Sequence, residues 1–206
     1  MLKIYGNKIS SPCHKVAFVA ELIGREYEWV ELEFGTDDLK SAEYRAIHPA
    51  GKVPAIQNGE LTLFESEAII RYLAEKAESP LFPADVETRA LVNQWGYFSV
   101  IHVGNAMGKV FFNRVIAPRF DLEVDERSLT EGSDWLARRF LPICDRRLGE
   151  SEHLATADLS LADITLLSVL DPAEKADVDL SPFSNLTKWR GRLQGMEFWK
   201  KVHGAT

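Results

Sequence analysis

The segment Ser10-Ser11-Pro12-Cys13 carries the side chains of this sequence best suited to chemistry at a sulfur atom. A serine hydroxyl that donates a hydrogen bond to a sulfur anion favours thiolate over thiol and lowers the thiol pKa. Pro12 suits the first turn of a helix, where unpaired N–H groups attract negative charge. The spacing predicts Ser11 at the N-cap and leaves Ser10 to point at a bound group. The plainer interpretation is that both serines only cap and turn the chain.

Two further segments have features that suit a peptide-like ligand. In His-Pro-Ala-Gly-Lys-Val-Pro, residues 48–54, a cis Val53-Pro54 bond would leave the Val53 backbone unpaired, so that an extended ligand adds as a strand. At Glu65-Ser66, the Ser66 hydroxyl and N–H can hold a carboxylate and Glu65 can pair with an ammonium. An ordinary edge-strand proline and simple helix capping are the plainer interpretations of these two segments.

All three segments fall at expected junctions between strands and helices. Apolar patterns predict strands and helices over residues 2–5 (strand), 12–23 (helix), 27–32 (strand), 53–57 and 61–64 (strands), and 65–77 (helix). A polar, irregular stretch at 35–46 has room for a short helix, and Asn58-Gly59 predicts a type I′ hairpin turn. This order is that of a thioredoxin-like domain, although spacing alone leaves other small α/β folds open.

The rest of the chain has a helical pattern. Long helices are expected over 87–114, with kinks near Gly104 and Gly108, and over 128–148, with a bend at Pro142. Ser160 and Asp163 form a capping box that opens a third helix, and shorter helices are expected at 172–178, 185–193 and 198–202. The predicted fold class is therefore α/β plus all-α: a thioredoxin-like domain at 1–78, a linker at 79–86 and an all-helical domain at 87–206.

Composition excludes several classes of partner. The 206 residues carry a formal net charge of −7, which argues against nucleic acid and anionic membrane surfaces. Cys13 and Cys144 are too few for a disulfide framework, and no apolar run resembles a signal peptide or a membrane span, so we expect a cytoplasmic protein. The histidines and cysteines show no ligand spacing, so no metal site is expected.

Four motifs in order give the sequence a family resemblance. Ser10-x-Pro-Cys-x-x-Val, Gly-Lys-Val-Pro, Glu-Ser-x-Ala-Ile-x-x-Tyr-Leu and Ser-Leu-Ala-Asp together resemble the soluble glutathione transferases over essentially the whole chain. The first motif looks most like the serine-type classes, the theta and phi groups and their bacterial relatives. The resemblance implies that glutathione is the co-substrate and that Ser10 activates its sulfur for attack on a small hydrophobic electrophile.

The resemblance also implies roles for the remaining candidates. Val53 would bind the cysteinyl backbone of glutathione beside Pro54, and Glu65 with Ser66 would hold the γ-glutamyl end. The other expected contacts are with the glycine carboxylate and the second substrate; the candidates are Lys52 and Lys40 for the carboxylate, and Ser11, Phe111 and Arg114 for the second-substrate pocket. A homodimer and a structural capping box at Ser160 and Asp163 are implied in the same way.

Three departures bear on subclass and activity. Tyr5 comes too early for the tyrosine of the tyrosine-type classes, and Pro12 interrupts the Ser-Ser-Cys of the zeta isomerases. Ser10-x-x-Cys13 resembles a thioredoxin motif without its first cysteine, so Cys13 is expected to pack rather than react. Two alternatives stay open: a glutathione-dependent isomerase, dehalogenase or ether-cleaving enzyme, and a non-catalytic binding module on the same fold.

Overall fold

The computed structural model describes residues 1–204, which divide into two compact units. The first unit contains Met1–Phe82 and the segment that begins at Glu197, and the second contains Pro83–Met196. The last helix therefore packs within the first unit, whereas we expected the second domain to run from 87 to 206.

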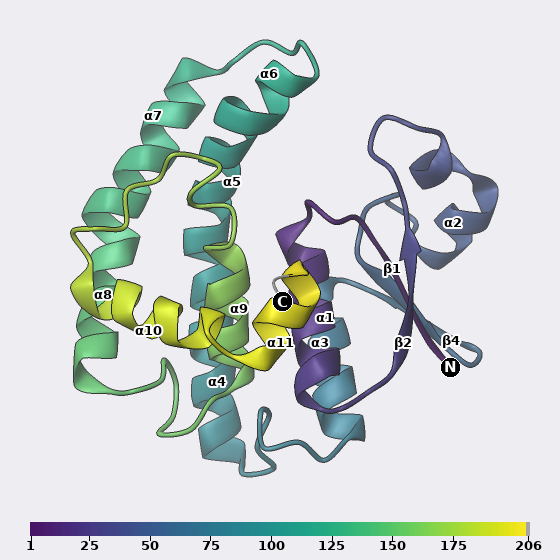
Figure 1. The fold of residues 1–206 in the computed structure, drawn as a ribbon, viewed down its shortest axis with the longest axis horizontal. Coiled ribbons are helices and arrows are strands. Elements are labelled where there is room, and N and C mark those ends of the chain that lie inside the picture. The colour runs from purple at the N-terminus through teal and green to yellow at the C-terminus, as the bar shows by residue number, and fades with distance from the viewer. Residues whose placement is uncertain (205–206) are drawn as a thin grey trace. The chain divides into compact units, whose positions relative to one another are not determined.

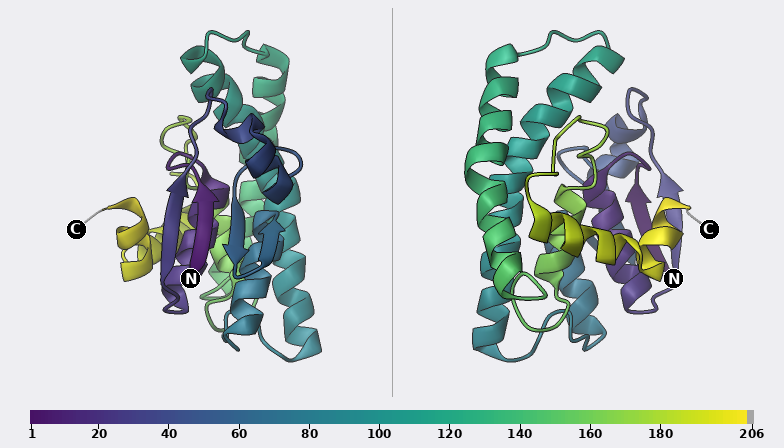
Figure 2. Two further views of the ribbon diagram at one scale, coloured as in Figure 1. Left: turned by 90° about the vertical axis from the view of Figure 1, so that its right-hand side faces the viewer. Right: turned by 60° about the vertical axis from the view of Figure 1, so that its left-hand side comes forward.

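A four-stranded mixed sheet organises the first unit (Figure 1). Its strands are β1 (Leu2–Gly6), β2 (Tyr27–Glu31), β3 (Ala55–Asn58) and β4 (Leu61–Phe64). They lie side by side in the order β2-β1-β3-β4 (Figure 2). β1 pairs in parallel with β2 and antiparallel with β3, which in turn pairs antiparallel with β4. This arrangement confirms the predicted thioredoxin-like fold.

Helices cover both faces of this sheet. They are α1 (Ser11–Leu22), α2 (Ala42–Ile47), which follows the short 3₁₀ helix Asp38–Lys40, α3 (Ser66–Lys76) and α11 (Glu197–His203). α1 and α3 pack together on one face, and α2 lies on the other (Figure 1). α1 is buried from Cys13 to Ala20, which fits its nearly continuous apolar sequence.

An aromatic cluster fixes α11 against α1. The ring of Phe18 lies 5.4 Å from that of Phe198 and 5.2 Å from that of Trp199. The His203 ring lies 4.0 Å from Trp199 and 4.7 Å from His14. These contacts explain why the C-terminal helix belongs with the first unit, which its sequence position does not reveal.

Helix α1 begins one residue earlier than predicted, because Ser10 rather than Ser11 is its N-cap. The Ser10 backbone is extended (φ −91°, ψ 107°), and its carbonyl accepts hydrogen bonds from the N–H groups of Cys13 and His14 at 2.9 and 3.1 Å. Proline is tolerated throughout the first turn, where N–H groups lack partners in any case. Pro12 is therefore compatible with either Ser10 or Ser11 as the N-cap.

The β3–β4 turn also differs from the prediction. Asn58 pairs with Leu61, so the central residues of the turn are Gly59 and Glu60. Only Gly59 has a positive φ, of 66°, whereas a type I′ turn needs positive φ at both central positions. The φ signs are those of a type II′ turn, which places glycine first.

The second unit is helical throughout its regular structure. Two long runs, 86–119 and 126–150, lie side by side (Figure 2). The first consists of α4 (Val86–Phe98), a π-helical segment (Ser99–Gly104), α5 (Asn105–Phe111), a second π-helical segment (Phe112–Ile116) and α6 (Ala117–Arg119). The second consists of α7 (Glu126–Trp135), a π-helical segment (Leu136–Phe140) and α8 (Leu141–Glu150), and α9 (Leu161–Val169) and α10 (Ser184–Gln194) follow.

The π-helical segments mark two of the expected irregularities. One ends at Gly104, and another comes directly before the helix that contains Pro142, whose missing N–H disfavours a regular ladder there. Gly108 lies instead within regular α5. Residues 171–177 form turns and residue 178 has no regular structure, so the helix predicted at 172–178 is wrong.

The predicted capping box is present and extends into a buried network. The Asp163 carboxylate accepts hydrogen bonds from the Ser160 N–H at 3.0 Å and the Ser160 hydroxyl at 2.9 Å. It also accepts from the Leu154 N–H at 2.8 Å and from Nε1 of Trp189 at 3.1 Å. Because Asp163 is fully buried, these four donors depend on it for their hydrogen bonds.

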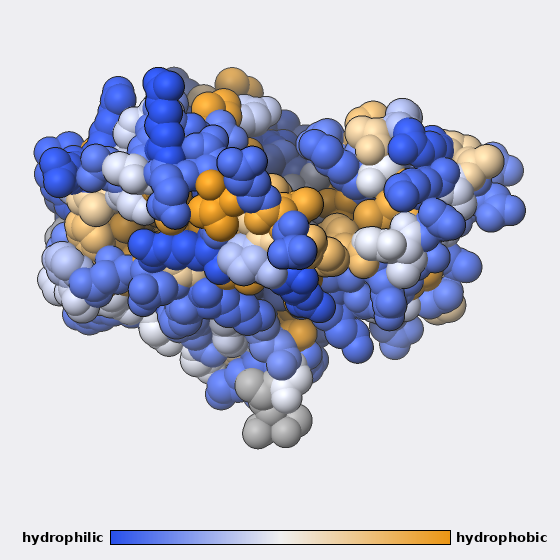
Figure 3. Space-filling model, turned by 90° about the horizontal axis from the view of Figure 1, so that it is seen from above, coloured by the Kyte–Doolittle hydropathy of each residue, from blue (hydrophilic) through white to orange (hydrophobic). Residues whose placement is uncertain are grey.

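The surface is mainly polar, with scattered large apolar side chains. Polar side chains cover most of the face in Figure 3, and apolar ones take up a smaller part. The exposed apolar residues include Phe34, Tyr97, Phe112 and Leu122. Among the residues that the structure describes, no helix has the length and apolar character needed to cross a membrane.

Replacing Asp163 with alanine tests the buried network. D163A leaves several buried donors without an acceptor, so we expect the free energy of unfolding to fall by about 3 kcal/mol or more. Urea unfolding followed by tryptophan fluorescence measures the change. The control is D158A, which removes an exposed carboxylate and is expected to change stability by no more than about 0.5 kcal/mol. Equal effects of the two substitutions would contradict a special role for Asp163.

Candidate active site

The junction between β1 and α1 places the Ser10 hydroxyl at a helix start without using it for capping. Buried Asn7 holds the turn: its Nδ2 donates to the Leu32 carbonyl at 2.8 Å, and its Oδ1 accepts from the Ile9 N–H at 3.1 Å. The Ser10 N–H donates to the Asn7 carbonyl at 3.0 Å. The Ser10 side chain makes no capping hydrogen bond, so its hydroxyl is not needed to satisfy the N–H groups of the first turn.

The thiol of Cys13, three residues after Ser10, has the burial and the pKa of an unreactive cysteine. The two side chains are hydrogen-bonded, and Cys13 is fully buried. Burial raises the pKa of the Cys13 thiol to about 11, although hydrogen bonds with Ser10 and the Asn7 backbone act in the opposite direction. Burial likewise raises the pKa of Cys144 to about 12. Both thiols stay protonated at neutral pH, in keeping with the packing role expected for Cys13.

The Val53-Pro54 peptide bond is cis, as predicted, and opens β3. Within the described chain, the N–H and C=O of half-buried Val53 have no hydrogen-bond partner. The hydroxyl of Tyr44 donates to the carbonyl of Lys52 at 2.6 Å and so fixes the backbone just before this residue. The unpaired backbone of Val53 can receive an extended peptide as an additional strand.

The connection from β4 to α3 has a strained backbone. Glu65, the N-cap of α3, adopts φ 69° and ψ 110°, a region that costs a non-glycine residue roughly 1–3 kcal/mol. Its exposed side chain makes no capping hydrogen bond, and Ser66 is the first helical residue. A carboxylate and a hydroxyl are thereby placed side by side at a helix N-terminus.

Strand register brings the three segments to one end of the sheet. Tyr5 pairs with Ala55, and Ala55 pairs with Phe64. β1 therefore ends where antiparallel β3 begins and where β4 ends. The segment with Ser10 follows β1, Val53-Pro54 directly precedes β3, and Glu65-Ser66 follows β4. Segments far apart in the sequence thus lie at one end of the sheet.

A buried ion cluster ties the two helix starts together. Nζ of Lys15 on α1 lies 2.6 Å from Oε1 of Glu67, and Nη1 of Arg71 lies 2.8 Å from Oε2 of the same carboxylate. Burial lowers the pKa of Lys15, and the charge of Glu67 counteracts this effect. Because Glu67 directly follows Ser66, the cluster fixes the start of α3 against α1.

The two candidate lysines are both exposed. Lys52 directly precedes Val53, at the same end of the sheet. Lys40 ends the 3₁₀ helix before α2, and its Nζ lies 3.8 Å from Oδ1 of Asp37. Lys52 is thus close in sequence to the other candidates, whereas Lys40 belongs to a separate segment.

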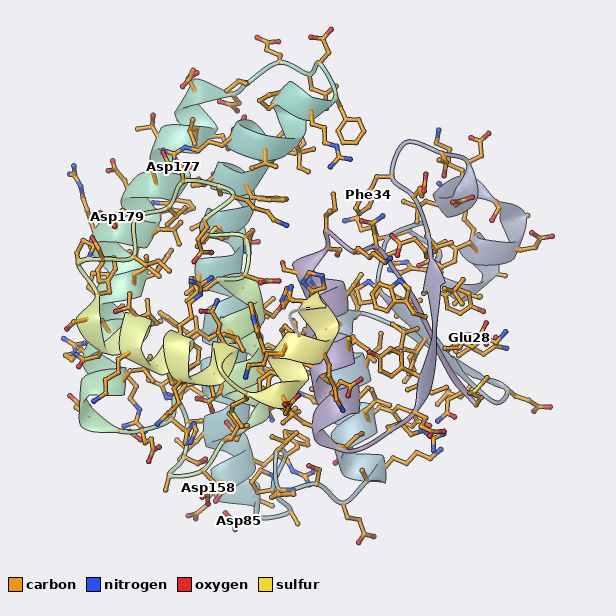
Figure 4. All side chains as sticks on the ribbon, in the orientation of Figure 1. Glu28, Phe34, Asp85, Asp158, Asp177 and Asp179 are labelled. Atoms are coloured by element: carbon orange, nitrogen blue, oxygen red, sulfur yellow. The ribbon has the colours of Figure 1, made fainter. Side chains whose placement is uncertain are left out.

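The candidates in the second unit take part in local structure. Arg114 donates through Nη1 to the carbonyl of Ala176 at 2.8 Å and to that of Asp177, which lies between α9 and α10 (Figure 4). Phe111 is half-buried at the end of α5. Arg114 therefore holds the segment that was expected to be helical at 172–178. Ser11, the remaining pocket candidate, is the first residue of α1 in the first unit.

Several residues that shape the site were not singled out from the sequence. Asn7 and Tyr44 act through hydrogen bonds to backbone groups, and no spacing rule identifies such contacts. Lys15 and Glu67 did leave a signal, because each is a charged residue in a largely apolar helical pattern. A charge within such a pattern is best explained by a buried partner of opposite sign.

Comparison with known proteins agrees with this geometry. Residues 1–75 match the family described as "Glutathione S-transferase, N-terminal domain" and residues 107–196 match "Glutathione S-transferase, C-terminal domain". Glutathione S-transferase 1 of Zea mays is 33% identical over 169 residues, covering 82% of this chain and 78% of the maize protein.

Solved structures extend the similarity to the whole fold. Glutathione S-transferase I from maize, in complex with an atrazine glutathione conjugate, has a TM-score of 0.90 at 29% identity and covers 99% of this chain and 97% of its own. A theta class enzyme from the citrus canker pathogen Xanthomonas axonopodis pv. citri, with glutathione bound, has a TM-score of 0.85 at 27% identity and covers 98% and 96%. With both domain families matched in order on one chain, the protein belongs to the glutathione S-transferase family.

Proposed function

We propose that this transferase promotes attack of the glutathione sulfur on a small hydrophobic electrophile, with Ser10 as the hydrogen-bond donor that favours the thiolate. The position of Ser10 carries this proposal: its hydroxyl stands at the start of α1 and is not used to cap the helix. A donor fixed in advance lowers the pKa of a bound thiol and aligns the nucleophile. Since both cysteines are buried, the reacting thiol in this proposal is that of the ligand and not one of the protein.

The remaining candidates would bind the tripeptide. The unpaired backbone of Val53, beside Pro54, suits the cysteinyl residue of glutathione as an added strand. Glu65 suits the γ-glutamyl ammonium, and Ser66 at the start of α3 suits the γ-glutamyl carboxylate. The glycine carboxylate and the electrophile complete the assignment; we assign Lys52 and Lys40 to the carboxylate, and Ser11, Phe111 and Arg114 to the electrophile pocket.

The finer classification is part of the same proposal. A serine at the start of the first helix supports a serine-type enzyme of the theta and phi kind. The similarity to a theta class structure with glutathione bound supports this assignment. We propose that the enzyme is a cytoplasmic homodimer, in line with the wider family.

Two other activities remain to be separated from conjugation. Isomerisation regenerates glutathione, whereas conjugation consumes it, so product analysis with an aryl halide distinguishes these reactions. A binding module with a vestigial site would bind glutathione without turnover or would not bind it at all. The maize relative holds an atrazine glutathione conjugate, which favours conjugation as the activity of this chain.

Replacing Ser10 with alanine tests the proposed donor. S10A removes the hydrogen bond to the bound sulfur, so the pKa of bound glutathione should rise by about one to two units. At a pH below that pKa, kcat/KM for an aryl halide should fall roughly 10- to 100-fold in proportion to the thiolate fraction. The absorbance of the thiolate during a pH titration measures the shift. S10T, which keeps a hydroxyl, is the control and should retain most of the effect; an unchanged pKa in S10A contradicts the role.

Replacing Glu65 with glutamine tests ammonium binding. E65Q keeps the shape of the side chain but removes its charge, so KM for glutathione should rise about tenfold while kcat at saturation changes little, because the contact is made equally before and during reaction. A glutathione analogue without the amino group should bind wild type and E65Q alike. A large fall in kcat with KM unchanged would overturn this assignment.

Alkylation tests the conclusion that the protein's own thiols are unreactive. With a pKa of about 11, Cys13 is expected to be thiolate in about one molecule in a thousand at pH 8, and the thiol is also fully buried. Iodoacetamide followed by mass spectrometry should therefore label Cys13 only after unfolding, with Cys144 as an internal control. Rapid labelling of Cys13 in the folded protein would reopen a redox role.

A further inference from the structure

His14 forms hydrogen bonds with two residues of the loop that contains Ser10. Its ring Nε2 lies 3.0 Å from the carbonyl oxygen of Lys8, and since a carbonyl only accepts, Nε2 carries the hydrogen of this bond. The backbone N–H of His14 donates to the Ser10 carbonyl at 3.1 Å. His14 therefore holds the backbone at Lys8 through its ring and at Ser10 through its N–H group.

The His14 ring is itself held in place. The side chain is buried, and its ring lies 4.7 Å from that of His203 and 6.2 Å from that of Phe18. The ring of Trp199 packs against His203 at 4.0 Å. The C-terminal helix thus restricts the ring of a residue whose hydrogen bond reaches the Ser10 loop.

We propose that His14 is a positioning residue for the transferase reaction, which fixes the Lys8–Ser10 backbone so that the Ser10 hydroxyl points at the glutathione sulfur. This inference rests on the proposed role of Ser10. Loss of the bond to Lys8 frees a carbonyl in the turn, and a hydroxyl displaced by a fraction of an ångström donates a weaker hydrogen bond. Asn7 holds the same turn from the side of β2, so His14 and Asn7 restrain it from two directions.

The substitution H14L removes the ring donor and tests this role. We expect the pKa of bound glutathione to rise by about one unit and kcat below that pKa to fall about tenfold. KM for glutathione should stay within about twofold, because the contacts at Val53, Glu65 and Ser66 are untouched. H14Q, whose amide can still donate toward Lys8, should restore most of the effect. If H14L does not fold, H14F keeps ring packing without the donor and serves for the same measurements.

A cavity elsewhere in the same helix is the matched control. V19A removes volume from a fully buried position on α1 and should lower the melting temperature without changing the thiol pKa. A pKa rise in V19A equal to that in H14L would show that general loosening of α1 is sufficient, and would overturn the positioning role.

The double variant S10A/H14L separates this inference from the proposed function. If His14 acts through Ser10, H14L has no further effect on the thiol pKa in the S10A background. Additive effects of the two substitutions overturn the inference. An unchanged pKa in S10A overturns the role of Ser10 itself, whereas a raised pKa in S10A with no change in H14L overturns only the role of His14.

Discussion

A serine hydroxyl at the start of α1, left out of the helix cap, is the feature on which the proposed function of this transferase depends. The carbonyl of Ser10 accepts from two N–H groups of the first turn, so the helix is satisfied at this point by backbone bonds. The side chain is then available to a ligand, at a helix end that favours negative charge. Strand register places the unpaired Val53 backbone and the Glu65-Ser66 corner at the same end of the sheet.

This arrangement is held at a local cost. Glu65 has a positive φ, Val53 leaves two backbone groups unpaired, and Lys15 is buried as half of an ion pair. Each of these features is unfavourable alone, and each would be removed by selection for stability only. Their concentration at one end of the sheet is typical of a functional site, where locally unfavourable conformations and burial are compensated by the surrounding packing.

Much of the fold followed from the sequence, because the signals were local or joint, whereas the roles of the site residues stay predictions. Alternating and helical periodicities located the strands and most helices. The ordered motifs singled out three candidate segments whose plainer interpretations were helix capping for two of them and an edge-strand proline for the third. The remaining features depend on tertiary contacts. The N-cap of α1 is Ser10 and not the predicted Ser11, Arg114 bonds to the carbonyls of the turn at Ala176 and Asp177, and α11 joins the first unit through rings that pack on Phe18. His14 and Asn7 act on backbone carbonyls, which carry no sequence pattern.

A crystal structure with glutathione bound tests the central claim most directly, since it locates the sulfur without kinetic assumptions. The account predicts the sulfur within about 3.5 Å of the Ser10 Oγ, with the cysteinyl backbone paired to Val53 and the γ-glutamyl end at Glu65 and Ser66. A sulfur that approaches another side chain and lies beyond hydrogen-bonding distance of the Ser10 hydroxyl would contradict it.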